Sequence, residues 1–185
     1  MAKTSSSMLP LGTPAPDFRL PDTVSGQVFS YADIAGTRAT LVMFICNHCP
    51  FVKHIIDELA QLGRDYSRPS VGMCAISSND VVGFPQDRPE RMKELAEQLG
   101  FAYPYLYDEP QNTARAYGAA CTPDFYVFDA DHRLAYRGQL DESRPGNGIP
   151  VDGSDIRQAL DNLLAGQPVA ESQKPSIGCN IKWKS

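Results

Sequence analysis

The segment Cys46-Asn-His-Cys49 holds the residues with the clearest chemical potential in the chain. Two residues separate the thiols, so one helical turn would bring both sulfur atoms within bonding range. The thiolate is the nucleophile of disulfide exchange, and a helix N-terminus favours it through unpaired N–H groups and the helix dipole. We expect Cys46, as the more exposed thiol, to attack a partner disulfide and Cys49 to resolve the mixed disulfide. A protonated His48 between them would stabilise the thiolate further.

Two other interpretations of the pair are open. In the first, the two thiols are unreactive and are neighbours at a turn without a chemical role. Alternatively, Cys46, Cys49, His48 and His54 offer zinc or copper ligands, which would make the chain a metal-binding or metallochaperone module. The sequence has no second Cys-x-x-Cys or paired histidine set to complete a closed structural site. We therefore assign no metal ligand and no cofactor.

Length and charge argue against several classes of function. The 185 residues suggest one domain, and the net charge of −5 leaves no basic stripe for nucleic acid. Apolar runs such as 41–46 are too short to span a bilayer, and the first eight residues lack the apolar stretch of a secretory signal. We therefore expect a cytoplasmic protein. Because that compartment keeps thiols reduced, conspicuous cysteines there are more often catalytic or metal-binding than structural.

The elements around the pair are those of an α/β protein. Residues 40–46 form a continuous apolar run, which is typical of a strand buried on both faces. Apolar residues at helical spacing predict a helix over about 50–66, and Pro50 suits its first turn. A second buried strand at 71–76 completes a β-α-β unit. The pair therefore lies where a strand ends and a helix begins, the position at which open α/β sheets place their sites.

Caps, apolar stripes and turn residues predict the remaining elements. They are hairpins over 18–31 and 125–137, an extended segment over 103–107, and helices over 87–99, 112–117 and 154–164. Asp87 and Ser154 are predicted as cap residues of two of these helices. The order of elements predicts a three-layer α/β/α sandwich with a central mixed sheet and an added N-terminal β-hairpin.

These motifs resemble the thioredoxin-like redoxins of the alkyl hydroperoxide reductase/thiol-specific antioxidant family. Segment 15–20 with Gly26 is similar to that family's opening hairpin, 44–50 to its active-site segment and 122–129 to its cis-proline strand. Residues 178–184 resemble the tail of a peroxiredoxin-like subgroup that carries a Cys-x-x-Cys pair. The resemblance implies a thioredoxin fold in a single domain over 1–185, with a core over about 12–165 and a C-terminal extension over 166–185.

Peroxiredoxins use a Pro, a Thr or Ser, the peroxidatic Cys and an Arg to bind peroxide. Aligning Cys49 with the peroxidatic Cys puts Cys46 at the Thr or Ser position and Val42 at the Pro position. The position of the peroxiredoxin Arg corresponds to Pro123, and thioredoxins have a proline at this position. The resemblance also implies a cis peptide before Pro123 that presents the Thr122 backbone to an extended polypeptide.

We therefore expect a thiol–disulfide oxidoreductase that exchanges electrons with a protein disulfide or dithiol and with a thioredoxin- or glutathione-type reductant. The first alternative is an antioxidant thiol peroxidase with Cys49 as the peroxidatic residue. In that case the oxidised Cys49 would form a disulfide with a resolving cysteine, which would be Cys46, Cys121 or Cys179. The guanidinium that polarises the peroxide would have to come from Arg115, Arg137 or Arg144. Cys121 and Cys179 are possible additional thiols, whereas Cys74 is expected to pack in a buried strand.

Overall fold

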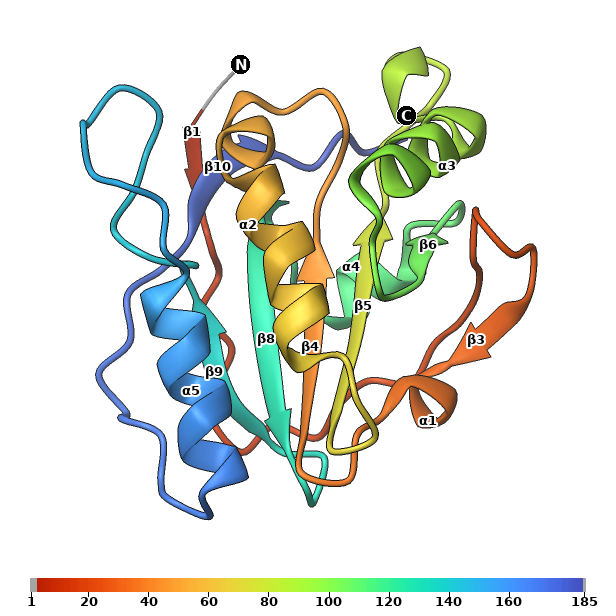
Figure 1. Cartoon of the computed structure of the whole chain (residues 1–185). Helices are drawn as coiled ribbons and strands as arrows, with labels where there is room; N and C mark the ends of the chain where they lie inside the picture. Colours follow the sequence, from red (N-terminus) through yellow and green to blue (C-terminus); the bar gives the residue numbers. More distant parts are fainter. Residues whose placement is uncertain (1–2, 185) are drawn as a thin grey trace.

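A mixed sheet of five strands forms the centre of the computed structural model, which describes residues 3–184 (Figure 1). Its order is β6 (Tyr105–Tyr107), β5 (Val71–Ser77), β4 (Ala39–Phe44), β8 (Asp124–Asp129) and β9 (Leu134–Gly138). Strand β5 is parallel to both of its neighbours, whereas β8 is antiparallel to both of its own. Every residue of β4 is buried, as its continuous apolar sequence predicts.

Helices cover both faces of this sheet. One face packs against α2 (Pro50–Tyr66), α3 (Pro89–Leu99) and α5 (Ser154–Leu164), and the other against α1 (Tyr31–Ile34) and α4 (Asn112–Ala116). In Figure 1, α2 and α5 lie in front of the sheet and α4 lies behind it. The architecture is the predicted thioredoxin-like α/β/α sandwich. No helix within residues 3–184 is long and apolar enough to cross a membrane.

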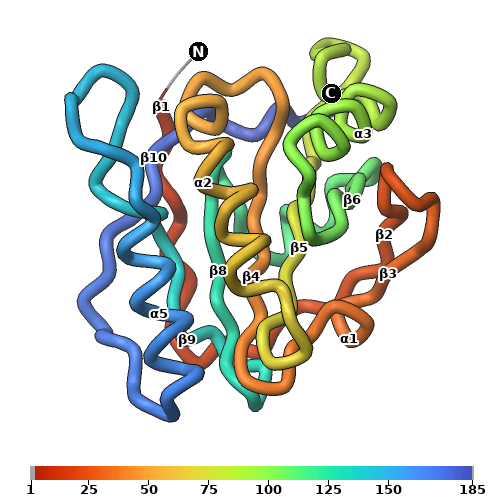
Figure 2. The backbone as a smooth tube through the Cα atoms, viewed as in Figure 1, coloured from red at the N-terminus to blue at the C-terminus, as the bar shows by residue number. Residues whose placement is uncertain are grey.

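Two smaller sheets accompany the central one. The first is the predicted N-terminal hairpin, in which β2 (Arg19–Pro21) pairs with β3 (Val28–Ser30). The second has the order β1 (Lys3–Ser5), β10 (Ile177–Asn180) and β7 (Cys121–Thr122), and nothing in the local sequence pattern predicts it. Figure 2 shows the blue C-terminal segment lying beside the red N-terminal strand and then passing the N-terminal end of α2.

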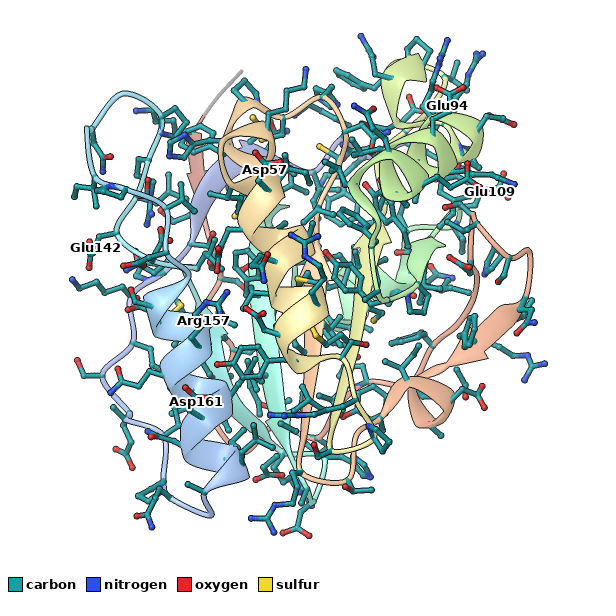
Figure 3. The ribbon with its side chains drawn as sticks, in the orientation of Figure 1. Asp57, Glu94, Glu109, Glu142, Arg157 and Asp161 are labelled. Carbon is teal, nitrogen blue, oxygen red and sulfur yellow. The ribbon has the colours of Figure 1, made fainter. Side chains whose placement is uncertain are left out.

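Ion pairs fix α5 against α2. Figure 3 labels Arg157 on α5, and its guanidinium lies 2.7 Å from Glu58 and 2.8 Å from Asp65, both on α2. These groups are only partly buried, so each pair contributes modestly to stability. They also join α5 to α2, whose N-cap is Cys49.

The predicted cap of α5 is wrong by one residue. Gly153 is the N-cap and Ser154 is already the first helical residue. The Asp141 carboxylate accepts the backbone N–H groups of Gly153 and Asp152 at 2.8 and 2.9 Å. The N–H groups of Asp155 and Ile156, which a local cap would otherwise take, donate instead to the Leu140 carbonyl oxygen at 3.2 and 3.4 Å.

Candidate active site

The two cysteines lie at the predicted junction of strand and helix. Cys46 follows the end of β4, and Cys49 is the N-cap of α2, with Pro50 as the first helical residue. Both side chains are buried, with exposed fractions of 1% for Cys46 and 0% for Cys49. Exposure therefore does not separate the two thiols, and the prediction that Cys46 is the more exposed one is not confirmed.

Hydrogen-bond donors converge on Cys49. The Cys46 thiol donates to it and lowers the pKa of Cys49, against the opposing effect of burial. The Cys179 thiol, whose sulfur is 2.9 Å from that of Cys49, and the backbone N–H groups of Val52 and Cys179 lower this pKa further. The carbonyl oxygen of Thr122, at 3.1 Å, accepts a hydrogen bond only from the protonated form of Cys49. Four donors outweigh this one acceptor, so the negative charge of the pair resides on Cys49.

Cys46 has the opposite environment. Its hydrogen bond to Cys49, its burial and the negative charge of Asp87 all raise the pKa of the Cys46 thiol. The Thr122 hydroxyl, whose oxygen is 3.4 Å from the Cys46 sulfur, is the one group that lowers it. Nδ1 of His48 is 3.8 Å from the same sulfur. The two thiols therefore share one proton, which Cys46 holds.

Asp87 organises the turn between the cysteines, and the sequence pattern misassigns it. The predicted helix cap is instead the last residue of a 3-10 turn (Pro85–Asp87) and is fully buried beneath the pair. Its Oδ1 accepts the backbone N–H groups of Asn47 and His48 at 2.8 and 3.2 Å. Its Oδ2 accepts the His48 ring and the Asn79 amide at 2.6 and 2.8 Å. Burial raises the pKa of this carboxyl, but these donors outweigh burial and the net pKa is lowered.

Asp87 is the residue of the site that sequence reasoning missed. The helix signature that begins with Asp87-Arg-Pro-Glu has an equally good local explanation as a cap. The role of Asp87 follows from a contact that spans 40 residues of sequence, and no local pattern contains that information. The ring of His48 also stacks on Phe84, at 5.0 Å between centroids, which fixes the histidine from its other side.

The arrangement does not favour the metal-binding alternative. Ligand atoms of Cys46, His48 and Asp87 lie within 4.8 Å of one another. However, the 2.6 Å between Nδ1 of His48 and the Asp87 oxygen is a hydrogen-bond length, whereas two ligands of one tetrahedral zinc stand about 3.3 Å apart. His54, the fourth ligand considered, is hydrogen-bonded to Ser143 at 2.8 Å and is not part of this group.

Thr122 and Pro123 lie against the pair, and the peptide bond between them is cis, as the resemblance implies. Thr122 contacts both cysteines, through its hydroxyl and its carbonyl oxygen. However, its backbone is not open to an incoming polypeptide. Strand β10 of the same chain pairs antiparallel with β7, with Cys179 directly opposite Thr122.

The remaining cysteines differ sharply from one another. Cys179 folds back onto Cys49, as already described. Cys121 is buried, and its sulfur is 3.5 Å from the Pro123 carbonyl oxygen; burial and the nearby Asp124 raise its pKa. Cys74 is buried in β5, and burial raises its pKa as well. The geometry thus brings Cys46, Cys49 and Cys179 together as one three-thiol cluster and leaves the other two as packed thiols.

None of the three arginines considered for a peroxide pocket lies at the three-thiol cluster. The Arg115 guanidinium lies over the Trp183 ring at 4.4 Å. Arg137 donates to the Gln173 side chain at 2.7 Å. Arg144 donates to the carbonyl oxygens of Asp141 and Ser143 at 2.6 and 2.7 Å.

Comparisons with known proteins agree with this geometry. Residues 11–137 match the AhpC/TSA family. A Mycobacterium tuberculosis protein that is named as a peroxiredoxin is 28% identical to this chain over 116 residues. The matched segment covers 63% of this chain and 68% of that protein.

Solved structures extend the similarity to the C-terminal segment. An uncharacterized conserved protein from Geobacillus kaustophilus is 58% identical with a TM-score of 0.97, covering 100% of this chain and 97% of that one. A hypothetical protein from Sinorhizobium meliloti is 47% identical with a TM-score of 0.95, covering 98% and 99%. The fold is also similar to that of a thiol:disulfide interchange protein DsbE from Chlorobium tepidum, at 18% identity and a TM-score of 0.65, covering 85% and 99%.

Proposed function

The chain belongs to the AhpC/TSA family, and from that premise we propose that it is a thiol–disulfide oxidoreductase whose redox couple is Cys46 and Cys49. The observation that carries the proposal is the position of the pair: Cys49 is the N-cap of α2 with the Cys179 thiol 2.9 Å away, and in this environment the pKa of Cys49 is lowered while that of Cys46 is raised. A thiolate and a thiol in contact are the two groups that a dithiol–disulfide cycle requires.

In the proposed cycle, the Cys49 thiolate attacks one sulfur of a substrate disulfide. A bond forms between that sulfur and Cys49, and the second substrate sulfur leaves as a thiolate. Cys46 then loses its proton and attacks the Cys49 sulfur, which releases the first substrate sulfur and leaves a Cys46–Cys49 disulfide. Two electrons pass from the pair to the substrate. The order of attack is the reverse of the sequence-based expectation, because the charge resides on Cys49.

His48 acts in this proposal as a positioning residue. Its ring and its backbone N–H both donate to Asp87, which fixes the turn that separates the two sulfur atoms. We propose that the substrate is a protein disulfide or dithiol and that a thioredoxin- or glutathione-type reductant restores the dithiol. We propose the cytoplasm as the compartment, because its thiol reductants keep such a pair reduced.

A redox titration tests the proposed couple. The protein is equilibrated in mixtures of reduced and oxidised dithiothreitol, quenched in acid and mapped by peptide mass spectrometry. We expect a Cys46–Cys49 disulfide in the wild type and in Cys74→Ala, a matched control that removes a buried thiol remote from the pair. A folded wild type that forms no Cys46–Cys49 disulfide at any ratio would overturn the proposal.

The rate of reaction with hydrogen peroxide separates this function from the peroxidase alternative. Because Arg115, Arg137 and Arg144 are bound elsewhere, the O–O bond receives no polarisation from them at Cys49. We expect the reduced protein to consume peroxide at the rate of an ordinary thiolate. A rate orders of magnitude higher would favour the peroxidase.

A further inference from the structure

The C-terminal strand occupies the place beside the cis peptide where the resemblance predicts an incoming polypeptide. Cys179 lies opposite Thr122 in the β10–β7 register, and Asn180 lies opposite Cys121. Gly178 permits this approach, since a Cβ atom there would lie 1.9 Å from the Thr122 carbonyl oxygen. The chain thus presents its own extended segment, with a cysteine in it, to its own cysteine pair.

Several contacts fix this segment independently of the sulfur atoms. The Ser176 hydroxyl donates to the Pro123 carbonyl at 2.6 Å, and the backbone of Ser176 exchanges hydrogen bonds with Ser6. Strand β10 also pairs along its other edge with β1. Beyond the strand, the N–H of Lys182 donates to Asn79 at 2.8 Å, next to Asp87. The position of Cys179 is therefore set by both flanks of the segment.

The sulfur atom of Cys179 is consequently held where a substrate sulfur would have to be. It is 2.9 Å from the Cys49 sulfur, and Cys179 is 4% exposed. Cys49 is the member of the three-thiol cluster that contacts the tail cysteine, and Cys46, three residues before it, lowers the pKa of the same thiol.

We propose that Cys179 is a third redox thiol and the in-chain exchange partner of Cys49. The proposal rests on the function inferred above. In the oxidised pair, the Cys179 sulfur attacks Cys49, a Cys49–Cys179 bond forms, and the Cys46–Cys49 bond breaks. The Cys179 proton passes to the departing Cys46 sulfur. The step is an isomerisation with no net oxidation, and it needs no external co-reactant.

The Cys49–Cys179 disulfide has a structural consequence. It ties β10 covalently to the N-terminal end of α2, across the Thr122–Pro123 peptide. In this state Cys46 is a free thiol, and the disulfide adds a covalent tie to the strand pairing that β10 already makes beside Thr122 when the thiols are free. Return of Cys46 onto Cys49 by the reverse exchange removes that tie.

The test uses glutathione disulfide and the full-length Cys46→Ser variant, in which Cys49 and Cys179 remain. Attack by Cys49 gives a Cys49–glutathione adduct, and Cys179 is expected to displace glutathione to give the Cys49–Cys179 disulfide. In the double variant Cys46→Ser/Cys179→Ser, the adduct should persist at least about tenfold longer, since an intramolecular thiol acts at a high effective concentration. Cys46→Ser/Cys121→Ser is the matched control and should resolve the adduct as Cys46→Ser does. Intact mass and peptide mapping distinguish these species.

The outcomes separate this inference from the proposed function. A wild type that forms the Cys46–Cys49 disulfide, together with a folded Cys46→Ser variant that retains glutathione on Cys49, overturns the role of Cys179 alone. A folded wild type that forms no Cys46–Cys49 disulfide overturns the proposed function. Resolution at the same rate with Cys179 replaced would also refute the inference. Circular dichroism of each variant establishes that it is folded.

Discussion

Gly178→Ala should separate Cys179 from Cys49 without touching either sulfur atom. The added Cβ would lie 1.9 Å from the Thr122 carbonyl oxygen, 2.5 Å from its carbon and 3.0 Å from the Pro123 nitrogen. Gly178 is not among the residues with positive φ, so an alanine meets no conformational penalty of its own there. The substitution therefore acts by steric contact between two backbone segments.

The magnitude follows from these distances. Moving the 1.9 Å contact out to 3.0 Å, below which Cβ contacts are essentially never found, displaces the strand by about 1.1 Å. Backbone hydrogen bonds fail beyond about 3.5 Å, so this displacement breaks the β10–β7 pairing. Overpacking of this kind costs about 1–3 kcal/mol. For a chain of this size each kcal/mol lowers Tm by about 2–4 °C.

The assay combines thermal unfolding with the glutathione experiment in the Cys46→Ser background. We expect the lower Tm together with a Cys49–glutathione adduct that persists, because Cys179 no longer contacts Cys49. Gly83→Ala is the matched control, since its Cβ meets only the flexible side chain of Asp80 at 3.1 Å. Unchanged Tm and unchanged adduct resolution in Gly178→Ala would show that the strand approaches Thr122 less closely than the structure indicates.

Three further substitutions test the electrostatics and packing of the site. Asp87→Asn removes a negative charge that raises the pKa of Cys46, so this pKa should fall in a pH titration that follows thiolate ultraviolet absorbance. The variant also loses buried charge-assisted hydrogen bonds, which should lower the free energy of unfolding by about 3 kcal/mol. Burial raises the pKa of Asp124 from 3.8 to about 7, so between these pH values the folded state binds more protons than the unfolded state. The free energy of unfolding therefore falls as pH rises through that window, by up to about 1.4 kcal/mol per pH unit. Asp124→Asn should abolish this slope in denaturant titrations at several pH values. Cys74→Ala should leave the Cys46–Cys49 disulfide intact and lower the free energy of unfolding by about 1 kcal/mol, because it leaves a small cavity. Loss of the disulfide in this variant would contradict the placement of Cys74 in the core.

The elements next to the cysteine pair were predictable because their signals are local. The buried strand before Cys46 and the helix after Cys49 follow from apolar runs and helical spacing in consecutive residues. The hairpin of β8 and β9 likewise follows from two apolar segments around polar turn residues. These features place two of the three thiols of the cluster at the correct junction.

The rest of the site depends on contacts between residues far apart in the chain. Cys179 meets Cys49 across 130 residues of sequence, and Asp87 reaches His48 across 39. No periodicity or cap signature encodes such pairings. The proton distribution of the pair was also unpredictable, since helix position alone cannot decide between two thiols. It is set by donors from Cys46, Cys179 and the α2 backbone.

The β1-β10-β7 sheet also has a consequence for biosynthesis. Strand β1 is made before every other element of this domain, whereas its partner β10 is complete only after residues 177–180 have been added. Closing so long a loop must wait for the rest of the chain, and domains generally fold as units once they are complete. The nascent protein therefore carries Cys46 and Cys49 without their third thiol. We expect Cys46 and Cys49 to react most readily with oxidants and with chaperone-bound partners in the interval before residues 177–180 are made and β10 covers the pair.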